Sequence, residues 1–160
     1  MVGSDSLKSI LVVDDEVGAR ESLKMILKGE YPVFLAKNAE EAFRHIDSHI
    51  PDVILLDIIL PDMDGLKVLE RLKQTLPDQI IIMITATKTV KTAVEAMKLG
   101  AYDYITKPFD VDELRLIINR ALSTRALKEE NQRLWMEVDR SFGFDNIVGK
   151  SKGMKEIFIM

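Results

Sequence analysis

Cysteine is absent from all 160 residues, which excludes disulfide bonds, cysteine-ligated zinc and thiol nucleophiles. No apolar run approaches the 18 residues of a membrane-spanning helix. The first nine residues lack the apolar run between a basic start and a cleavage site that a secretion signal needs. These absences predict a cytoplasmic protein that does not enter a membrane.

An excess of basic residues is also lacking, because 22 Lys and Arg stand against 26 Asp and Glu, for a net charge of -4. Such a chain has no basic field for a nucleic-acid backbone, so we expect no direct nucleic-acid contact by this fragment. The 47% hydrophobic and 30% charged content is typical of a soluble globular protein. The length predicts one domain with an appendage.

Short apolar runs recur along the chain and predict five β-strands. They lie at residues 10–13, 33–36, 53–56, 80–84 and 102–106. Helical patterns separate them, at residues 17–28, from Asn38, from Gly65 and from about Thr89, where Val90, Ala93, Val94 and Met97 recur and Gly100 ends the pattern. The helix after Asp110 meets no Pro or Gly before Gly143. Asn38 with Glu41, and Asp110 with Glu113, have the spacing of capping boxes.

This alternation predicts an α/β fold: a doubly wound, flavodoxin-like, five-stranded parallel sheet of order 2-1-3-4-5, with helices on both faces and an extended C-terminal helix. In that order the first and third strands are neighbours. Asp14 and Asp15, which follow the first strand, then share a crevice with Asp57, which follows the third. Thr85 and Lys107 end the fourth and fifth strands and border the same crevice.

Three carboxylates this close cannot all stay ionised without a cation. Oxygen-only ligands with room for water and a phosphoryl oxygen favour Mg²⁺ over zinc. A carboxylate beside Mg²⁺ can attack phosphorus and form an aspartyl phosphate, with Lys107 and the metal stabilising the charge of the transferring group. Thr85 offers a hydroxyl to a phosphoryl oxygen. Asp57 is the predicted nucleophile.

With these residues in place, the chain resembles a response-regulator receiver domain. The motifs are V-V-D-D-E at 12–16, L-L-D-I-I-L-P-D-M-D-G at 55–65, T-A at 85–86 and Y-I-T-K-P-F at 104–109. The resemblance implies that Asp57 accepts a phosphoryl group from a sensor histidine kinase. It also implies that Mg²⁺ is held by Asp14, Asp15, Asp57 and the backbone carbonyl of Ile59. Lys107, with a cis bond to Pro108, contacts the phosphoryl group, and Thr85 with Tyr104 forms a switch pair.

After the receiver at residues 8–122, we expect a helical linker at 123–141. Ile117, Thr124, Leu127, Asn131, Leu134 and Val138 have heptad-like spacing, which favours a homodimeric coiled coil over a single solvated helix. The tail at 142–160 resembles the truncated start of the AAA+ ATPase domain in sigma-54-dependent activators of the nitrogen-regulation type. The implied protein is a phosphorylation-gated regulator of such an activator, in which phosphorylation changes the dimer arrangement.

Two other functions remain open. The first is a Mg²⁺-dependent aspartyl-nucleophile phosphatase or phosphotransferase that acts on small phosphoesters, and the second is an unphosphorylated interaction module. Asp62 and Asp64 resemble the D-x-D of the phosphatases, but Ile59 stands where that class has its general acid. His45 and His49 lack metalloprotease spacing, and Gly149-Lys150-Ser151 lacks the first glycine of a phosphate loop. We therefore expect a phosphoacceptor domain, not an enzyme, apart from its own phosphorylation and dephosphorylation.

Overall fold

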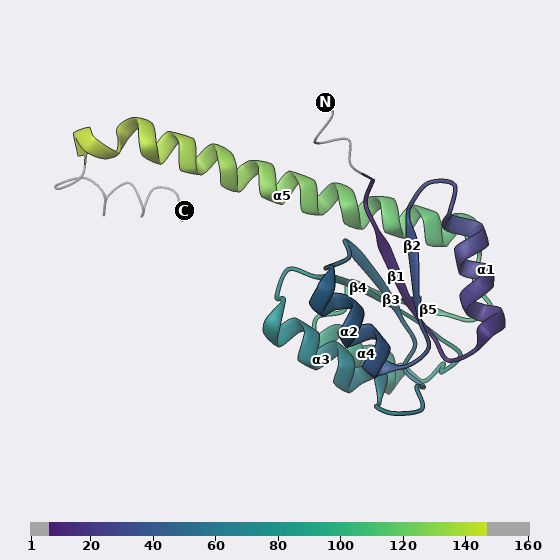
Figure 1. Cartoon of the computed structure of the whole chain (residues 1–160). Coiled ribbons are helices and arrows are strands. Elements are labelled where there is room, and N and C mark those ends of the chain that lie inside the picture. The colour runs from purple at the N-terminus through teal and green to yellow at the C-terminus, as the bar shows by residue number, and fades with distance from the viewer. Residues whose placement is uncertain (1–6, 147–160) are drawn as a thin grey trace. The chain divides into compact units, whose positions relative to one another are not determined.

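The structure, a computed structural model, describes residues 7–146 and divides the chain into two compact units, Met1–Leu122 and Ser123–Met160. The first unit contains a five-stranded, all-parallel sheet in the order β2-β1-β3-β4-β5 (Figure 1), which confirms the predicted topology. The strands are β1 Ile10–Val13, β2 Val33–Ala36, β3 Val53–Leu56, β4 Ile80–Thr85 and β5 Asp103–Thr106.

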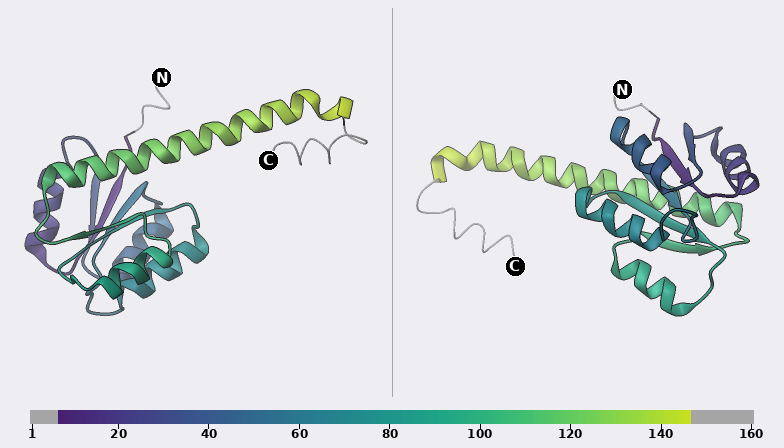
Figure 2. Two further views of the ribbon diagram at one scale, coloured as in Figure 1. Left: turned by 180° about the vertical axis from the view of Figure 1, so that it is seen from behind. Right: turned by 60° about the horizontal axis from the view of Figure 1, so that its bottom comes forward.

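The helices alternate with these strands, as the sequence predicts. They are α1 Val17–Leu27, α2 Ala39–Ser48, α3 Gly65–Thr75, α4 Val90–Lys98 and α5 Val111–Asn146. Helices α2, α3 and α4 cover one face of the sheet, and α1 with the first part of α5 covers the other (Figures 1 and 2). Within residues 7–146, no helix combines the length and the apolar character needed to cross a bilayer.

Alternate side chains of each central strand supply the two cores. Ile10 and Val12 of β1 point toward α1 and α5, whereas Leu11 and Val13 point toward α2 and α3. Strands β1, β3 and β4 are buried along their whole length. This explains why they are almost entirely apolar, since a parallel sheet with helices on both faces leaves no strand face to solvent.

Helix caps agree with the sequence in part. The Asn38 side chain accepts from the Glu41 N–H at 2.8 Å, as the predicted capping box requires, but the Glu41 carboxylate reaches back to the N–H of Lys37. The Asp110 side chain accepts from Asp112, not from Glu113. The second box is therefore a simpler cap of the same helix.

In two helices, α4 and α5, the burial of apolar residues differs from what their spacing in the sequence predicts. The residues that marked α4 in the sequence include Val90, Val94 and Met97, which are exposed, and Ala96 is the helix's buried residue. Ile117, assigned to the dimer seam, is buried in the core beneath α5. Helix α5 continues to Asn146, so it includes the first five residues of the segment at 142–160 that was predicted to start the AAA+ domain. The rest of that segment, from residue 147 onward, lies outside the described residues.

Candidate functional site

The register of the sheet brings two of the three predicted acidic residues, Asp14 and Asp57, together. Val13 of β1 pairs with Leu56 of β3, and the N–H of Asp57 donates to the carbonyl of Val13 at 3.0 Å. Asp14 and Asp57, each one residue past its strand, therefore stand side by side at the carboxyl edge. This is where open parallel sheets place ligands.

Lys107 enters the same site from the end of β5, and its peptide bond to Pro108 is cis, as the resemblance implies. Its backbone N–H donates to the Thr85 carbonyl at 2.8 Å, which fixes the start of the side chain beside β4. The ammonium then lies 2.5 Å from Asp14 Oδ2 and 3.1 Å from Asp57 Oδ2. The carboxylates are 93 and 50 residues away in the chain.

Burial governs the electrostatics of this trio. Asp14 and Asp57 are only 2% and 6% exposed. Burial raises the pKa of the Asp14 carboxyl, against the opposing bonds from Lys107 and the Glu16 N–H. Burial alone would lower the pKa of Lys107, but its bond to Asp14 and the charge of Asp57 outweigh that effect and raise it. The two shifts therefore have different causes: burial raises the pKa of Asp14, whereas the two neighbouring carboxylates raise the pKa of Lys107.

The chemistry of these groups fits a hard divalent cation. The metal-binding atoms are carboxylate oxygens, and two buried carboxylates face one partly exposed ammonium, which leaves an excess of negative charge. Mg²⁺ is commonly held by only one or two carboxylates, with water and phosphate oxygens completing its shell. Among residues 7–146, no group of three or more His, Cys, Asp or Glu side chains is arranged to hold a metal. Asp15 lies exposed in the loop after β1, so its role as a ligand stays a prediction.

The loop after Asp57 packs tightly against the strand end. The Ile59 N–H lies 3.2 Å from Asp57 Oδ1, and the Gly65 N–H donates to the Ile58 carbonyl at 2.7 Å. A Cβ on Gly65 would lie 2.2 Å from the Asp57 carbonyl oxygen and 2.5 Å from Ile58 Cα. Only glycine fits there. The sequence identified Gly65 as a helix start but did not reveal this close approach.

Thr85 and Tyr104 lie on neighbouring strands near the site. The Thr85 side chain is fully buried, and its hydroxyl oxygen accepts a long 3.4 Å bond from the Thr87 N–H. The Tyr104 hydroxyl donates to the carbonyl of the same Thr87 at 2.7 Å. Burial and the charge of Asp57 raise the pKa of Tyr104. The two side chains are thus linked through one residue of the loop between β4 and α4.

Two residues at the site received no role from the sequence. Arg20 of α1 donates to the backbone carbonyl of Asp14 at 2.7 Å. Glu16, whose N–H bonds to Asp14, has its own carboxylate 3.7 Å from the Lys107 ammonium. The acidic run after β1 was a signal for Glu16, whereas nothing local pointed to Arg20.

The histidine pair lies apart from these groups. His45 packs against Phe34 of β2 with the two rings tilted by 38° and their centroids 4.8 Å apart, and it meets His49 edge to face at 6.1 Å. The pKa of His45 is lowered by burial and by the neighbouring His49. The pair belongs to an aromatic cluster at the edge strand.

Comparisons with known proteins agree with the geometry. The family described as response regulator receiver domain matches residues 10–119. The regulatory protein AtoC of Escherichia coli K12 is 38% identical over 154 residues, which cover 95% of this chain and 33% of AtoC. The DNA-binding transcriptional regulator NtrC of Rhizobium meliloti is 35% identical and is matched over 30% of its length. The chain thus spans about a third of the length of these curated relatives.

Solved structures show the same fold. The crystal structure of NtrX from Brucella abortus has a TM-score of 0.76 and 39% identity, over 81% of this chain and 30% of that one. A CheY-like receiver domain protein from Methanospirillum hungatei JF-1 has a TM-score of 0.74 and 35% identity, over 77% of this chain and 99% of that one. These similarities are to regulators and do not favour the alternative of a small-phosphoester phosphatase.

Proposed function

We propose a function from one established fact: the chain belongs to the response regulator receiver domain family. It is therefore a signalling domain of the two-component type. In our proposal Asp57 takes a phosphoryl group from a phosphohistidine of a sensor histidine kinase. An Asp57 oxygen attacks phosphorus, the bond from phosphorus to the histidine nitrogen breaks, and an aspartyl phosphate forms.

The observation that carries this proposal is the trio of Asp57, Asp14 and Lys107 at the strand ends. The carboxylate of Asp57, the proposed nucleophile, is almost fully buried. The Lys107 ammonium lies 3.1 Å from it and can stabilise the negative charge on the incoming phosphoryl oxygens. Asp14 and Asp57, with Asp15 and the Ile59 carbonyl, would hold Mg²⁺. When bound, the ion would neutralise charge on the phosphoryl oxygens.

The switch pair follows from the same chemistry. A phosphoryl group at Asp57 adds up to two negative charges and new acceptor oxygens. The Thr85 hydroxyl, which holds only a 3.4 Å bond at present, can turn to donate to one of them. Tyr104 is joined to the same loop through Thr87, so a movement of that loop reaches β5 and α5. In this proposal the domain catalyses its own phosphorylation and dephosphorylation and no other reaction.

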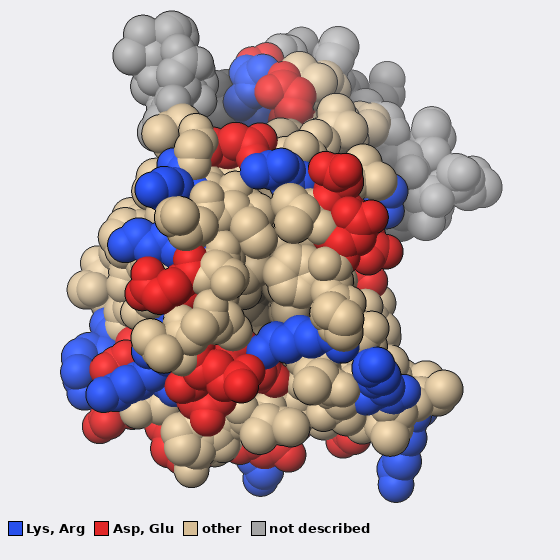
Figure 3. All heavy atoms as spheres, turned by 90° about the vertical axis from the view of Figure 1, so that its right-hand side faces the viewer, with Lys and Arg blue, Asp and Glu red and all other residues tan. Residues whose placement is uncertain are grey.

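The longer protein is proposed to be a sigma-54-dependent transcription activator, working in the cytoplasm and carrying an AAA+ domain after this region. Its relatives AtoC and NtrC are regulators, and NtrC is named as DNA-binding. This fragment itself is not proposed to contact nucleic acid. On the face shown in Figure 3, acidic and basic side chains are interspersed without a continuous basic area.

The linker part of α5 is proposed to form a homodimer. Leu127 and Leu134 are 67% and 46% exposed, and Asn131 lies on the same stripe, also exposed. A polar residue at a coiled-coil core position sets register and oligomer state. Because Ile117 is buried within the receiver, the proposed seam starts at Thr124.

The test is phosphoryl uptake from phosphoramidate with Mg²⁺, followed by intact mass. The wild-type chain should gain one phosphoryl group, and Asp57→Asn should gain none, because the nucleophile is lost while the volume is kept. Asp47→Asn, a change at an exposed residue of α2, is the matched control and should behave as wild type. Wild-type uptake by Asp57→Asn would refute the assignment, and sustained turnover of ordinary phosphoesters would favour a phosphatase.

A further inference from the structure

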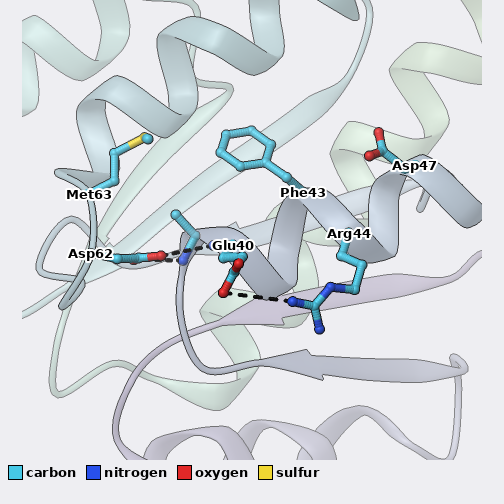
Figure 4. Close-up of a pocket in the computed structure, with 7 residues that line it drawn as sticks. Glu40, Phe43, Arg44, Asp47, Asp62 and Met63 are labelled. Carbon is cyan, nitrogen blue, oxygen red and sulfur yellow. Dashed lines mark hydrogen bonds and ion pairs between the residues drawn. The ribbon is translucent and has the colours of Figure 1, made fainter.

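Asp62 links the loop after the phosphorylation site to a different helix. Its Oδ1 accepts from the N–H of Ala39 at 2.9 Å, and its Oδ2 accepts from the N–H of Glu40 at 2.9 Å. Figure 4 shows the Asp62 carboxylate pointing at the start of α2, beside a hollow that Phe43 and Met63 also line. In the sequence, Asp62 stood out only as part of a pattern that resembles the D-x-D motif of phosphatases.

The arrangement is favourable for a charged side chain. The first N–H groups of a helix have no partner within the helix, and the helix dipole favours negative charge there. A carboxylate that accepts two such N–H groups makes charge-assisted bonds, which are stronger than neutral ones. Burial acts to raise the pKa of Asp62, but the N–H groups of Ala39 and Glu40 outweigh it and lower that pKa. Asp62 is therefore an ionised anchor at neutral pH.

The other end of the same segment is at the nucleophile. Ile59 lies two residues after Asp57, and its N–H is 3.2 Å from Asp57 Oδ1. Asp62 fixes the segment three residues further on. Asp64 does not serve this purpose, because its side chain accepts from Leu66 and thus caps only α3. Asp62 thus links residues 58–62 to the start of α2 by two hydrogen bonds, in addition to the apolar packing of Ile58 in the core cluster that α2 shares.

We propose that Asp62 is a positioning residue, whose carboxylate latches the loop to α2 and so holds the Ile59 backbone in place for Mg²⁺-dependent phosphoryl uptake by Asp57. The inference rests on the proposed function. It predicts that loss of the latch weakens the response to Mg²⁺ more than it slows the transfer itself, because bound Mg²⁺ would restore the loop conformation that the latch otherwise maintains.

The comparison that tests this is Asp62→Ala against Asn38→Ala in the full chain. Both changes remove side-chain bonds from the N-terminus of α2, but Asn38 bonds to Glu41 within the helix and not to the loop. Amide exchange by NMR without Mg²⁺ comes first. In Asp62→Ala the Ala39 and Glu40 amides and the Ile59 amide should exchange faster, whereas in Asn38→Ala the Ile59 amide should exchange as in wild type.

Phosphoryl uptake from phosphoramidate is then measured over a Mg²⁺ titration. In Asp62→Ala the half-saturating Mg²⁺ concentration should rise about three- to tenfold, which is at or below the roughly 10- to 100-fold effects of groups that support metal ligands directly. The rate at saturating Mg²⁺ should stay near wild type. Asn38→Ala should match wild type in both. Asp62→Asn keeps the volume and one acceptor oxygen, so its shift should fall between those of wild type and Asp62→Ala.

An unchanged Mg²⁺ midpoint in Asp62→Ala, or an equal shift in Asn38→Ala, would overturn the proposal. If Asp62→Ala does not fold, Asp62→Asn decides in the same way. If the wild-type chain takes up no phosphoryl group at saturating Mg²⁺, the proposed function fails and the role of Asp62 in uptake fails with it. The exchange rate of the Ile59 amide would still show whether Asp62 holds the loop, so the two failures are distinguishable.

Discussion

Gly65→Ala offers a direct measure of how closely α3 approaches the phosphorylation site. The new Cβ would stand 2.2 Å from the Asp57 carbonyl oxygen, 2.5 Å from Ile58 Cα and 2.9 Å from the Ile58 carbonyl oxygen. All three are backbone atoms and cannot rotate away as a side chain would. The helix start must therefore move away from the end of β3, which strains the 2.7 Å bond from the Gly65 N–H to Ile58.

The magnitude follows from these opposing effects. Overpacking in a tight site costs about 1–3 kcal/mol, and weakening one hydrogen bond adds about 0.5–1.5 kcal/mol. The lower entropy of alanine in the unfolded chain returns about 0.5–1 kcal/mol. The free energy of unfolding should thus fall by about 0.5–4 kcal/mol. A middle value of about 2 kcal/mol lowers a urea midpoint by roughly 1 M for a domain of this size.

Gly18→Ala is the matched control, because nothing lies within 4 Å of the Cβ position at Gly18 in α1. This change should leave the fold intact and stabilise it by about 0.5–1 kcal/mol, since it replaces glycine within a helix. Both variants are compared with wild type by urea denaturation followed by circular dichroism. If Gly65→Ala is as stable as wild type, the close approach of Gly65 to Asp57 and Ile58 is wrong.

Two further predictions concern charge and assembly. The pKa of Asp14 is raised above its unfolded value of 3.8, so the folded state binds more protons and loses stability as pH rises through the folded pKa. Measured with a chelator present, Asp14→Asn should therefore gain stability relative to wild type from pH 4 to pH 7, and a pH-independent difference would contradict this. Sedimentation of chains ending at Leu122 and at Arg140, with and without beryllofluoride, should show that only the longer one dimerises and that the mimic partly shifts its arrangement. A longer chain that is monomeric in both states, or two chains that dimerise equally, would refute the linker coil.

The sequence by itself determined the architecture and the main candidates for the site. Apolar runs such as Val53–Leu56 predict strands buried on both faces, because a strand that has helices on both sides needs apolar side chains at every position. Once the strand order is known, the residue that follows each strand must lie at the shared edge. The sequence alone therefore assigns four residues to one crevice, namely Asp14, Asp57, Thr85 and Lys107.

Contacts between distant segments were decided only by the tertiary structure. The placing of Lys107 between Asp14 and Asp57, and the bonds of Asp62 to Ala39 and Glu40, depend on how loops and helices pack. Helical spacing likewise does not say which apolar residues find a partner, so Ile117 is buried while Val90 is exposed. A local sequence pattern indicates that a residue will be buried or that a helix end will be capped. Which residue it contacts depends on distances between segments that are far apart in the sequence, and only the folded chain sets those distances.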